Sequence, residues 1–238
     1  MDVLLGLWEN VTTRHTPLPL ATALWTVAAA LILVLVPALW RQTRHVITLA
    51  HEGGHAVAAT LSGRQLGGIR LHSDTSGLTV SRGRPSGLGM IFTLLAGYAA
   101  PSLLGLGAAR MLSLGYDVAL LWLMLMALAL ILVQIRNWFG LWSVAVSGAA
   151  VLGVSWLGSA EVQGIFALLV TAVLLLGAVR AVLELQRSRS RSRSRQGHAS
   201  DADQLARLTH LPGIVWVAVF LVIATTSAWV GADVLGLV

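Results

Sequence analysis

The chain has 238 residues, of which 56% are hydrophobic and only 11% are charged. Soluble domains carry roughly 25% charged residues, so this composition excludes an ordinary soluble globular protein and predicts an integral membrane protein. There is no cysteine, which excludes disulfides and thiolate ligands, so any zinc must take nitrogen and oxygen ligands. The formal net charge of +6 comes from arginines that gather between apolar segments, and that pattern indicates membrane orientation.

Apolar segments long enough to cross a bilayer as helices recur along the chain. We expect an all-α polytopic membrane protein with about seven transmembrane helices, forming a single domain over residues 1–238. The first apolar segment is long enough to span and lacks a clear cleavage site, so we expect no cleavable signal peptide. The predicted spans lie near residues 19–40, 46–62, 88–114, 117–135, 138–158, 162–185 and 212–233.

The second predicted span contains the most informative pattern, His51-Glu52-Gly53-Gly54-His55. Histidines four residues apart share one helix face, so both can bind one Zn²⁺, and Glu52 can act as general base toward a zinc-bound water. The alternative is that these side chains only hydrogen-bond to neighbouring helices. We favour the metal site, because ionisable groups are costly inside a membrane and the alternative must satisfy three of them by coincidence.

The loop over residues 63–87 separates the second and third predicted spans. Apolar and polar residues alternate over 69–72 and 78–81, which predicts a short β-hairpin after the histidine-containing helix. An open strand edge cannot face lipid, so the hairpin should lie at the membrane surface or cover a water-filled cavity. Beside a metal site such an edge could bind an extended substrate by strand addition, although an ordinary connection between helices gives the same pattern.

Arginine and serine alternate over residues 187–195, and we expect a disordered basic loop over 187–199. Basic loops stay on the cytosolic side, so this loop sets the orientation of a multi-pass protein in a bacterial-type cell membrane. We favour a solvated loop over nucleic-acid binding, so the expected partner is the lipid bilayer and not a nucleic acid. Counting spans backwards places the 63–87 loop in the cytosol, but it places Arg41 and Arg44 outside, against the rule.

Four stretches resemble a known family. Residues 51–63, HEGGHAVAATLSG, are similar to the zinc helix of the site-2-type intramembrane metalloproteases, family M50. Residues 77–79 (GLT), 96–101 (AGYAAP) and 200–209 (SDADQLARLT) resemble its M50B-like branch more specifically. The resemblance covers about residues 45–220. It implies Zn²⁺-dependent cleavage, within the bilayer, of the transmembrane segment of a protein substrate.

Catalytic zinc normally has three protein ligands. The family's LDG motif, which supplies the third ligand, is absent here, so the sequence does not decide which residue is the third ligand. Asp201 is one candidate, although it could instead belong to a helix cap that begins at Ser200. Asn137 is the other candidate. Its amide oxygen is a weak zinc ligand, so it could instead orient the substrate backbone or serve only as a turn residue.

The sequence therefore predicts a zinc metalloendopeptidase in which His51 and His55 bind the metal, Glu52 activates water, and Asp201 or Asn137 completes the site. A catalytically inactive membrane scaffold that retains the protease fold is the alternative, and the missing LDG motif supports it. A transporter with a buried ionisable pair is less favoured, because no internal repeat is visible.

Overall fold

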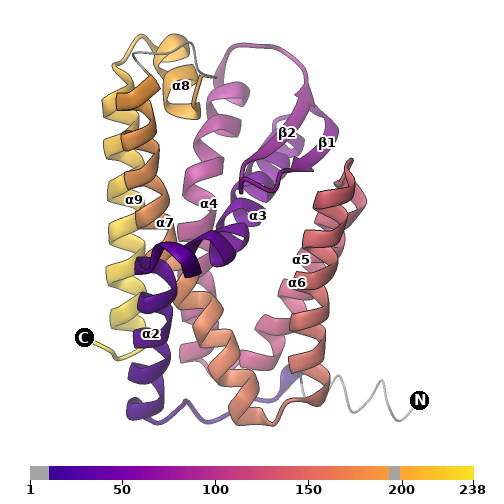
Figure 1. Ribbon diagram of the computed structural model, residues 1–238, viewed down its shortest axis with the longest axis vertical. Helices are drawn as coiled ribbons and strands as arrows, with labels where there is room; N and C mark the ends of the chain where they lie inside the picture. The colour runs from indigo at the N-terminus through magenta and orange to yellow at the C-terminus, as the bar shows by residue number, and fades with distance from the viewer. Residues whose placement is uncertain (1–10, 193–198) are drawn as a thin grey trace.

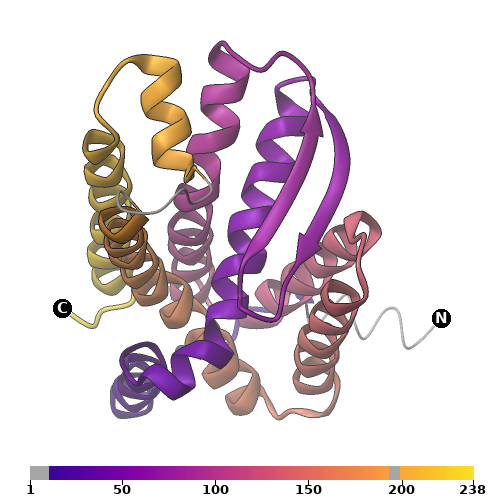
Figure 2. The same cartoon turned by 45° about the horizontal axis from the view of Figure 1, so that its top comes forward.

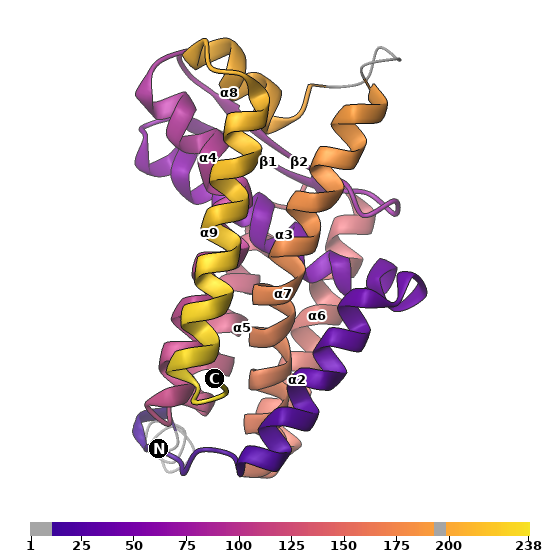
Figure 3. The ribbon, with the colours of Figure 1, turned by 90° about the vertical axis from the view of Figure 1, so that its left-hand side faces the viewer.

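The computed structural model describes residues 11–192 and 199–238. α4 packs against α3, α7 and α9, while α5 and α6 pair beside them. The two strands and α8 lie at the same end of the helices (Figures 1 and 3). The elements in chain order are α2 (Leu20–Leu35), α3 (Pro37–Leu61), β1 (Gln65–Leu71), β2 (Gly77–Arg82), α4 (Leu88–Ser113), α5 (Asp117–Gln134), α6 (Trp138–Leu157), α7 (Ala160–Ser192), α8 (Asp201–Thr209) and α9 (Gly213–Val234).

Five described helices are long and apolar enough to cross a membrane, namely α4, α5, α6, α7 and α9. α2 and α3 meet this criterion only as a pair, bent by 100°, so the described residues provide five or six spans where we expected about seven. The bend lies at Val36, whose backbone is extended, with Pro37 at the start of α3. Proline disfavours a helical conformation in the residue before it, which explains the bend.

The bend changes the position of two arginines. We expected Arg41 and Arg44 in a loop between two separate spans, but both lie within α3. They are therefore part of a helix and not of a loop between two spans. The expected basic loop also begins later than predicted, because α7 continues through Ser192. Residues 193–198 of that loop lie outside the described residues.

β1 and β2 pair antiparallel, from Gln65 opposite Arg82 to Leu71 opposite Gly77. The sheet lies alongside α3 (Figure 2). The connection between α5 and α6 adds one parallel bridge to the outer edge of β1, between Ile69 and Ile135. Among the described residues, no strand pairs with the other edge of β2.

A buried apolar cluster fixes α8 against the helix bundle. Ala202 and Leu205 of α8 are fully buried, and they pack with residues of α4, α7 and α9. α8 is amphipathic, so burying this face leaves its polar residues at the edge of the bundle. The buried members of the cluster are Leu94, Val182, Leu185, Ala202, Leu205, Val217 and Phe220.

Gly54 allows α3 and α4 to approach closely. A Cβ atom at this position would lie 2.7 Å from the carbonyl oxygen of Ala96 and would also overlap the side chain of Ala100. Small residues at helix contacts allow this kind of packing in membranes. The neighbouring Gly53 differs, because its Cβ would lie at an ordinary 3.4 Å from Ile131.

This contrast yields a stability prediction. We expect Gly54→Ala to lower the free energy of unfolding by about 1–3 kcal/mol, because the new methyl group must push α4 away from α3. Gly53→Ala is the matched control on the same helix, and we expect it to leave the stability nearly unchanged. Thermal unfolding in detergent measures both variants. Equal losses of stability would contradict the close approach of the two helices at Gly54.

Candidate metal centre

The fold brings His51 and His55 of α3 together with Asp201 at the start of α8. The two histidine Nε2 atoms are 3.0 Å apart. One carboxylate oxygen of Asp201, Oδ2, lies 3.3 Å from His51 Nε2 and 3.2 Å from His55 Nε2. The donor atoms of these three residues all lie within 4.8 Å of one another, and among the described residues they form a group that could hold a metal ion.

These distances fit a tetrahedral zinc ion. With Zn–N and Zn–O bonds of 2.0–2.1 Å, neighbouring ligand atoms are about 3.3–3.4 Å apart. The separations between the three donor atoms are 3.0–3.3 Å, so little movement is needed to accommodate the ion. Two imidazoles and one carboxylate form a common donor set for catalytic zinc, and three protein ligands leave a fourth position for water.

Residues of α4 and α9 orient the two histidines. His55 donates a hydrogen bond from Nδ1 to the backbone oxygen of Thr93, at 2.8 Å, which leaves the lone pair of Nε2 facing His51 and Asp201. The ring of Tyr98 contacts the His51 ring edge-on at 4.6 Å between centroids, and it stacks on Phe220. Both imidazoles are therefore held in orientations suited to metal binding.

Asp203, not Asp201, makes the reciprocal capping contacts of α8. The Ser200 hydroxyl accepts a hydrogen bond from the backbone N–H of Asp203, and the Asp203 carboxylate accepts from the backbone N–H of Ser200 in return. Arg189 of α7 also pairs with Asp203, at 2.8 Å. The alternative role that we considered for Asp201 thus belongs to its neighbour, and Asp201 can point toward the histidines.

The environment of Asp201 favours its ionised form. Burial raises the pKa of a carboxyl group, but the imidazoles of His51 and His55 outweigh this effect and hold the pKa of Asp201 well below its usual range. A carboxylate must be ionised to bind a metal ion. Asp201 therefore already has the charge state that a metal ligand needs.

Glu52 lies beside this group and is buried. Its Oε2 accepts a hydrogen bond of 2.6 Å from the hydroxyl of Thr79, which fixes the carboxylate against β2. Gly77 makes this approach possible, since a Cβ there would lie 2.5 Å from Glu52 Oε1. The sheet therefore positions the acid that we predicted as general base.

Asn137 does not join the three ligand candidates. Its amide oxygen accepts a hydrogen bond from the backbone N–H of Leu71, at 3.1 Å, and its amide nitrogen donates to the backbone oxygen of Leu71, at 2.6 Å. Both ends of the amide are thus used to tie the connection between α5 and α6 to β1. This position agrees with a residue at a tight connection between helices.

A cavity of about 970 Å³ opens onto His51 and Glu52. It lies between α3, α7 and the turn that joins the two strands, and it has both polar and apolar lining residues. An open cavity beside the ligand candidates gives space for water and for a substrate segment next to the metal position.

The sequence matches the Peptidase M50B-like family over residues 24–231. The chain belongs to this family. No curated protein and no solved structure matches the chain. Membership of the M50B-like family supports an integral membrane protein of metalloprotease type, and the cluster of His51, His55 and Asp201 lies within the matched region.

Sequence reasoning missed three residues that shape this M50B-like site. Thr79 binds Glu52, Thr93 orients His55, and Gly97 leaves room for both histidine rings. Thr79 and Gly97 lie in the GLT and AGYAAP stretches whose resemblance to the M50B-like branch is visible in the sequence. Their roles depend on contacts between α3, α4 and β2, which one sequence does not provide.

The geometry predicts which candidate is the third ligand. We expect His51→Ala and Asp201→Ala to abolish stoichiometric zinc binding, and we expect Asn137→Ala to retain it, because Asp201 contacts the histidines and Asn137 is bound to Leu71. Mass spectrometry of detergent-purified protein measures metal content. Loss of zinc in Asn137→Ala, with full retention in Asp201→Ala, would reverse the assignment.

Gly97 provides a second test of the same site. A Cβ at Gly97 would overlap the ring of His55 and lie 2.8 Å from the ring of His51, so we expect Gly97→Ala to weaken zinc binding at least tenfold. Gly107 lies on the same helix with no atom near its Cβ position, which makes Gly107→Ala the matched control. Titration with a zinc chelator compares the two variants. Equal affinities would show that α4 does not constrain the histidines.

Proposed function

We propose that this protein is an intramembrane zinc metallopeptidase that hydrolyses peptide bonds in the transmembrane segments of membrane-protein substrates. The observation that carries the proposal is the convergence of His51, His55 and Asp201 beside Glu52, next to an open cavity. The donor set of two imidazoles and one carboxylate supports zinc as the metal. Membership of the M50B-like family supports the reaction.

Each residue has a separate role in this reaction. His51, His55 and Asp201 would hold the zinc ion, which when bound polarises the scissile carbonyl and lowers the pKa of water to about 7. Glu52 takes a proton from the attacking water and passes it to the leaving amine. The hydrogen bond from Thr79 keeps the Glu52 carboxylate in place during both transfers.

A substrate helix must unwind before it can react, because its carbonyl groups are used in hydrogen bonds within the helix. The edge of β2 that pairs with no described strand offers a place for the unwound segment. Gly77 and Thr79 of this strand both contact Glu52. An extended segment that pairs with this edge would therefore pass beside the general base.

The distribution of arginines supports a cytosolic position for the end that carries the strands and α8. Five arginines lie in the two connections at this end, over residues 62–87 and 135–137. In the described connections at the opposite end, over residues 11–19, 114–116 and 158–159, the only arginine is Arg14. By the positive-inside rule, this distribution supports a metal centre nearer the cytosol.

The inactive scaffold was favoured by the absence of an LDG carboxylate. The contacts of Asp201 with both histidines support it as a carboxylate ligand in place of the LDG aspartate, which weakens the argument for the scaffold. We therefore retain the peptidase as the proposed function.

The roles of Glu52 and Thr79 are tested with single-span model substrates in proteoliposomes. We expect zinc-loaded wild type to cleave within the span, and Glu52→Gln to lower kcat by roughly 10²–10⁴ without loss of zinc, because the general base is removed. Thr79→Val should also lower kcat, while Thr79→Ser, the matched control, should retain it. Cleavage sites and rates are measured by mass spectrometry. Wild-type rates in Glu52→Gln would contradict the proposed mechanism.

A further inference from the structure

The cavity beside the metal centre continues along α3 toward its first turns. Arg44, Thr48 and His51 are spaced at i, i+4 and i+7, so they lie on one face of this helix. Arg44 and Thr48 line the cavity together with His51. Seven residues of helix correspond to about 10 Å along the axis, which is the distance by which Arg44 is offset from the metal ligand.

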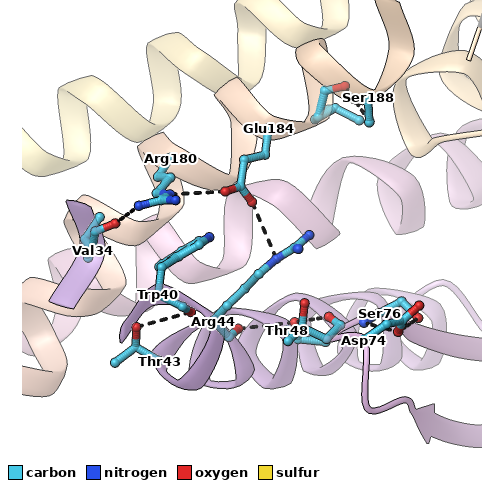
Figure 4. A network of polar contacts seen from close by, with 12 residues as sticks. Val34, Trp40, Thr43, Arg44, Thr48, Asp74, Ser76, Arg180, Glu184 and Ser188 are labelled. Carbon is cyan, nitrogen blue, oxygen red and sulfur yellow. Dashed lines mark hydrogen bonds and ion pairs between the residues drawn. The ribbon is translucent and has the colours of Figure 1, made fainter. Parts of the chain in front are cut away.

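Glu184 and Arg180 of α7 face Arg44 across the cavity (Figure 4). Glu184 accepts a hydrogen bond of 3.1 Å from Arg180 Nε, and Arg180 also donates to the backbone oxygen of Val34. The guanidinium of Arg180 lies over the ring of Trp40, at 4.8 Å. Arg180 is therefore held in place by three separate contacts.

Arg44 is held much less firmly. Its Nε forms an ion pair with Glu184 Oε2 at 3.6 Å, which is longer than a hydrogen bond, and its side chain is 40% exposed. Among the described residues, its guanidinium donates no hydrogen bond. The N–H groups of Arg44 are therefore available to a ligand in the cavity, and a guanidinium matches a carboxylate with two parallel hydrogen bonds.

The surroundings of Arg44 also favour a negatively charged ligand. Four arginines line the cavity against two carboxylates, those of Glu52 and Glu184. Of these arginines, Arg41 and Arg187 are not within ion-pair distance of a described carboxylate. Trp40 is only 3% exposed, and its indole N–H has no hydrogen-bond partner in the described structure. Glu184 Oε2 in the same cavity also has no hydrogen-bond partner among the described residues, and its nearest cation is Arg44. A ligand that supplies an acceptor oxygen would satisfy the indole donor.

We propose that this cavity is a substrate subsite for an acidic side chain, an aspartate or a glutamate, which Arg44 binds through its carboxylate. The inference rests on the proposed function. An extended chain advances about 3.3 Å per residue, so the offset of Arg44 from the metal ligand places the acidic residue about three residues from the scissile bond.

The position of the cavity favours a peptide substrate over a lipid as the ligand. The same cavity opens onto His51 and Glu52, so its occupant lies next to the bond that reacts. Acidic residues are rare within transmembrane segments. A subsite that requires one would therefore select a small set of transmembrane segments.

Binding to the Glu52→Gln protein tests this subsite without cleavage. The probes are fluorescein-labelled alanine–leucine transmembrane peptides with a single aspartate, each compared with the peptide that carries asparagine at the same position, in nanodiscs of neutral lipid. The aspartate is moved along the peptide one position at a time. At some positions the aspartate peptide should bind roughly tenfold more tightly than the asparagine peptide, which is the gain that a charged hydrogen bond provides. Arg44→Gln should remove this preference, and Arg44→Lys should retain part of it.

Arg110→Gln is the matched control, because it removes the same charge from an exposed position at the far end of α4. It should leave the preference for aspartate unchanged. Equal binding of aspartate and asparagine peptides at every position, or a preference that survives Arg44→Gln, would overturn the subsite. If phosphatidylglycerol removes the preference through Arg44, the ligand is a lipid phosphate and the peptide proposal fails.

Zinc content and cleavage by wild type are measured separately from peptide binding. If a zinc-loaded, active protein does not prefer aspartate, the subsite alone is wrong. A preference that depends on Arg44, in a protein that neither binds zinc nor cleaves, would contradict the peptidase function and support the anion site.

Discussion

The contact of one carboxylate with two imidazoles is the interaction on which the rest of the structure depends. Three largely buried polar side chains in an apolar bundle are stable only if they satisfy one another or bind an ion. His51 and His55 come from α3, but Asp201 must be delivered by α8, near the other end of the chain. Much of the surrounding architecture serves to hold that third group in place.

Several independent contacts hold α8 there. Ala202 and Leu205 bury its apolar face, while Asp203 caps its first turn and pairs with Arg189 of α7. On the opposite side, Gly97 leaves space for the two histidine rings. The site therefore depends on close helix packing as much as on the identity of its ligands.

Local patterns in the sequence are sufficient to predict the part of the site that lies on one helix. The spacing of His51 and His55 predicts a shared helix face, and alternating residues predict strands after this helix. For the third ligand the sequence offers two candidates, because neither Asp201 nor Asn137 has a local pattern that decides its role. Only the packing of α8 against the bundle brings Asp201 to the histidines and leaves Asn137 at β1.

The span count failed for a different physical reason. Hydropathy recognises apolar length, but it does not register that Pro37 bends the chain while α2 and α3 remain in contact. The same bend moves Arg41 and Arg44 from an expected loop into a helix that lines the cavity. The two arginines that disagreed with the positive-inside rule thus mark the place where the chain departs from a series of simple spans.

The separation of the ligands along the chain has a consequence for biogenesis. The ribosome completes His51 and His55 early, but Asp201 follows only after α7 has been synthesised. A nascent chain with two imidazoles alone lacks the third ligand of a catalytic zinc site. Under the proposed function, the metal site is therefore complete only after Asp201 has been synthesised, and hydrolytic activity cannot begin before α8 has joined the bundle.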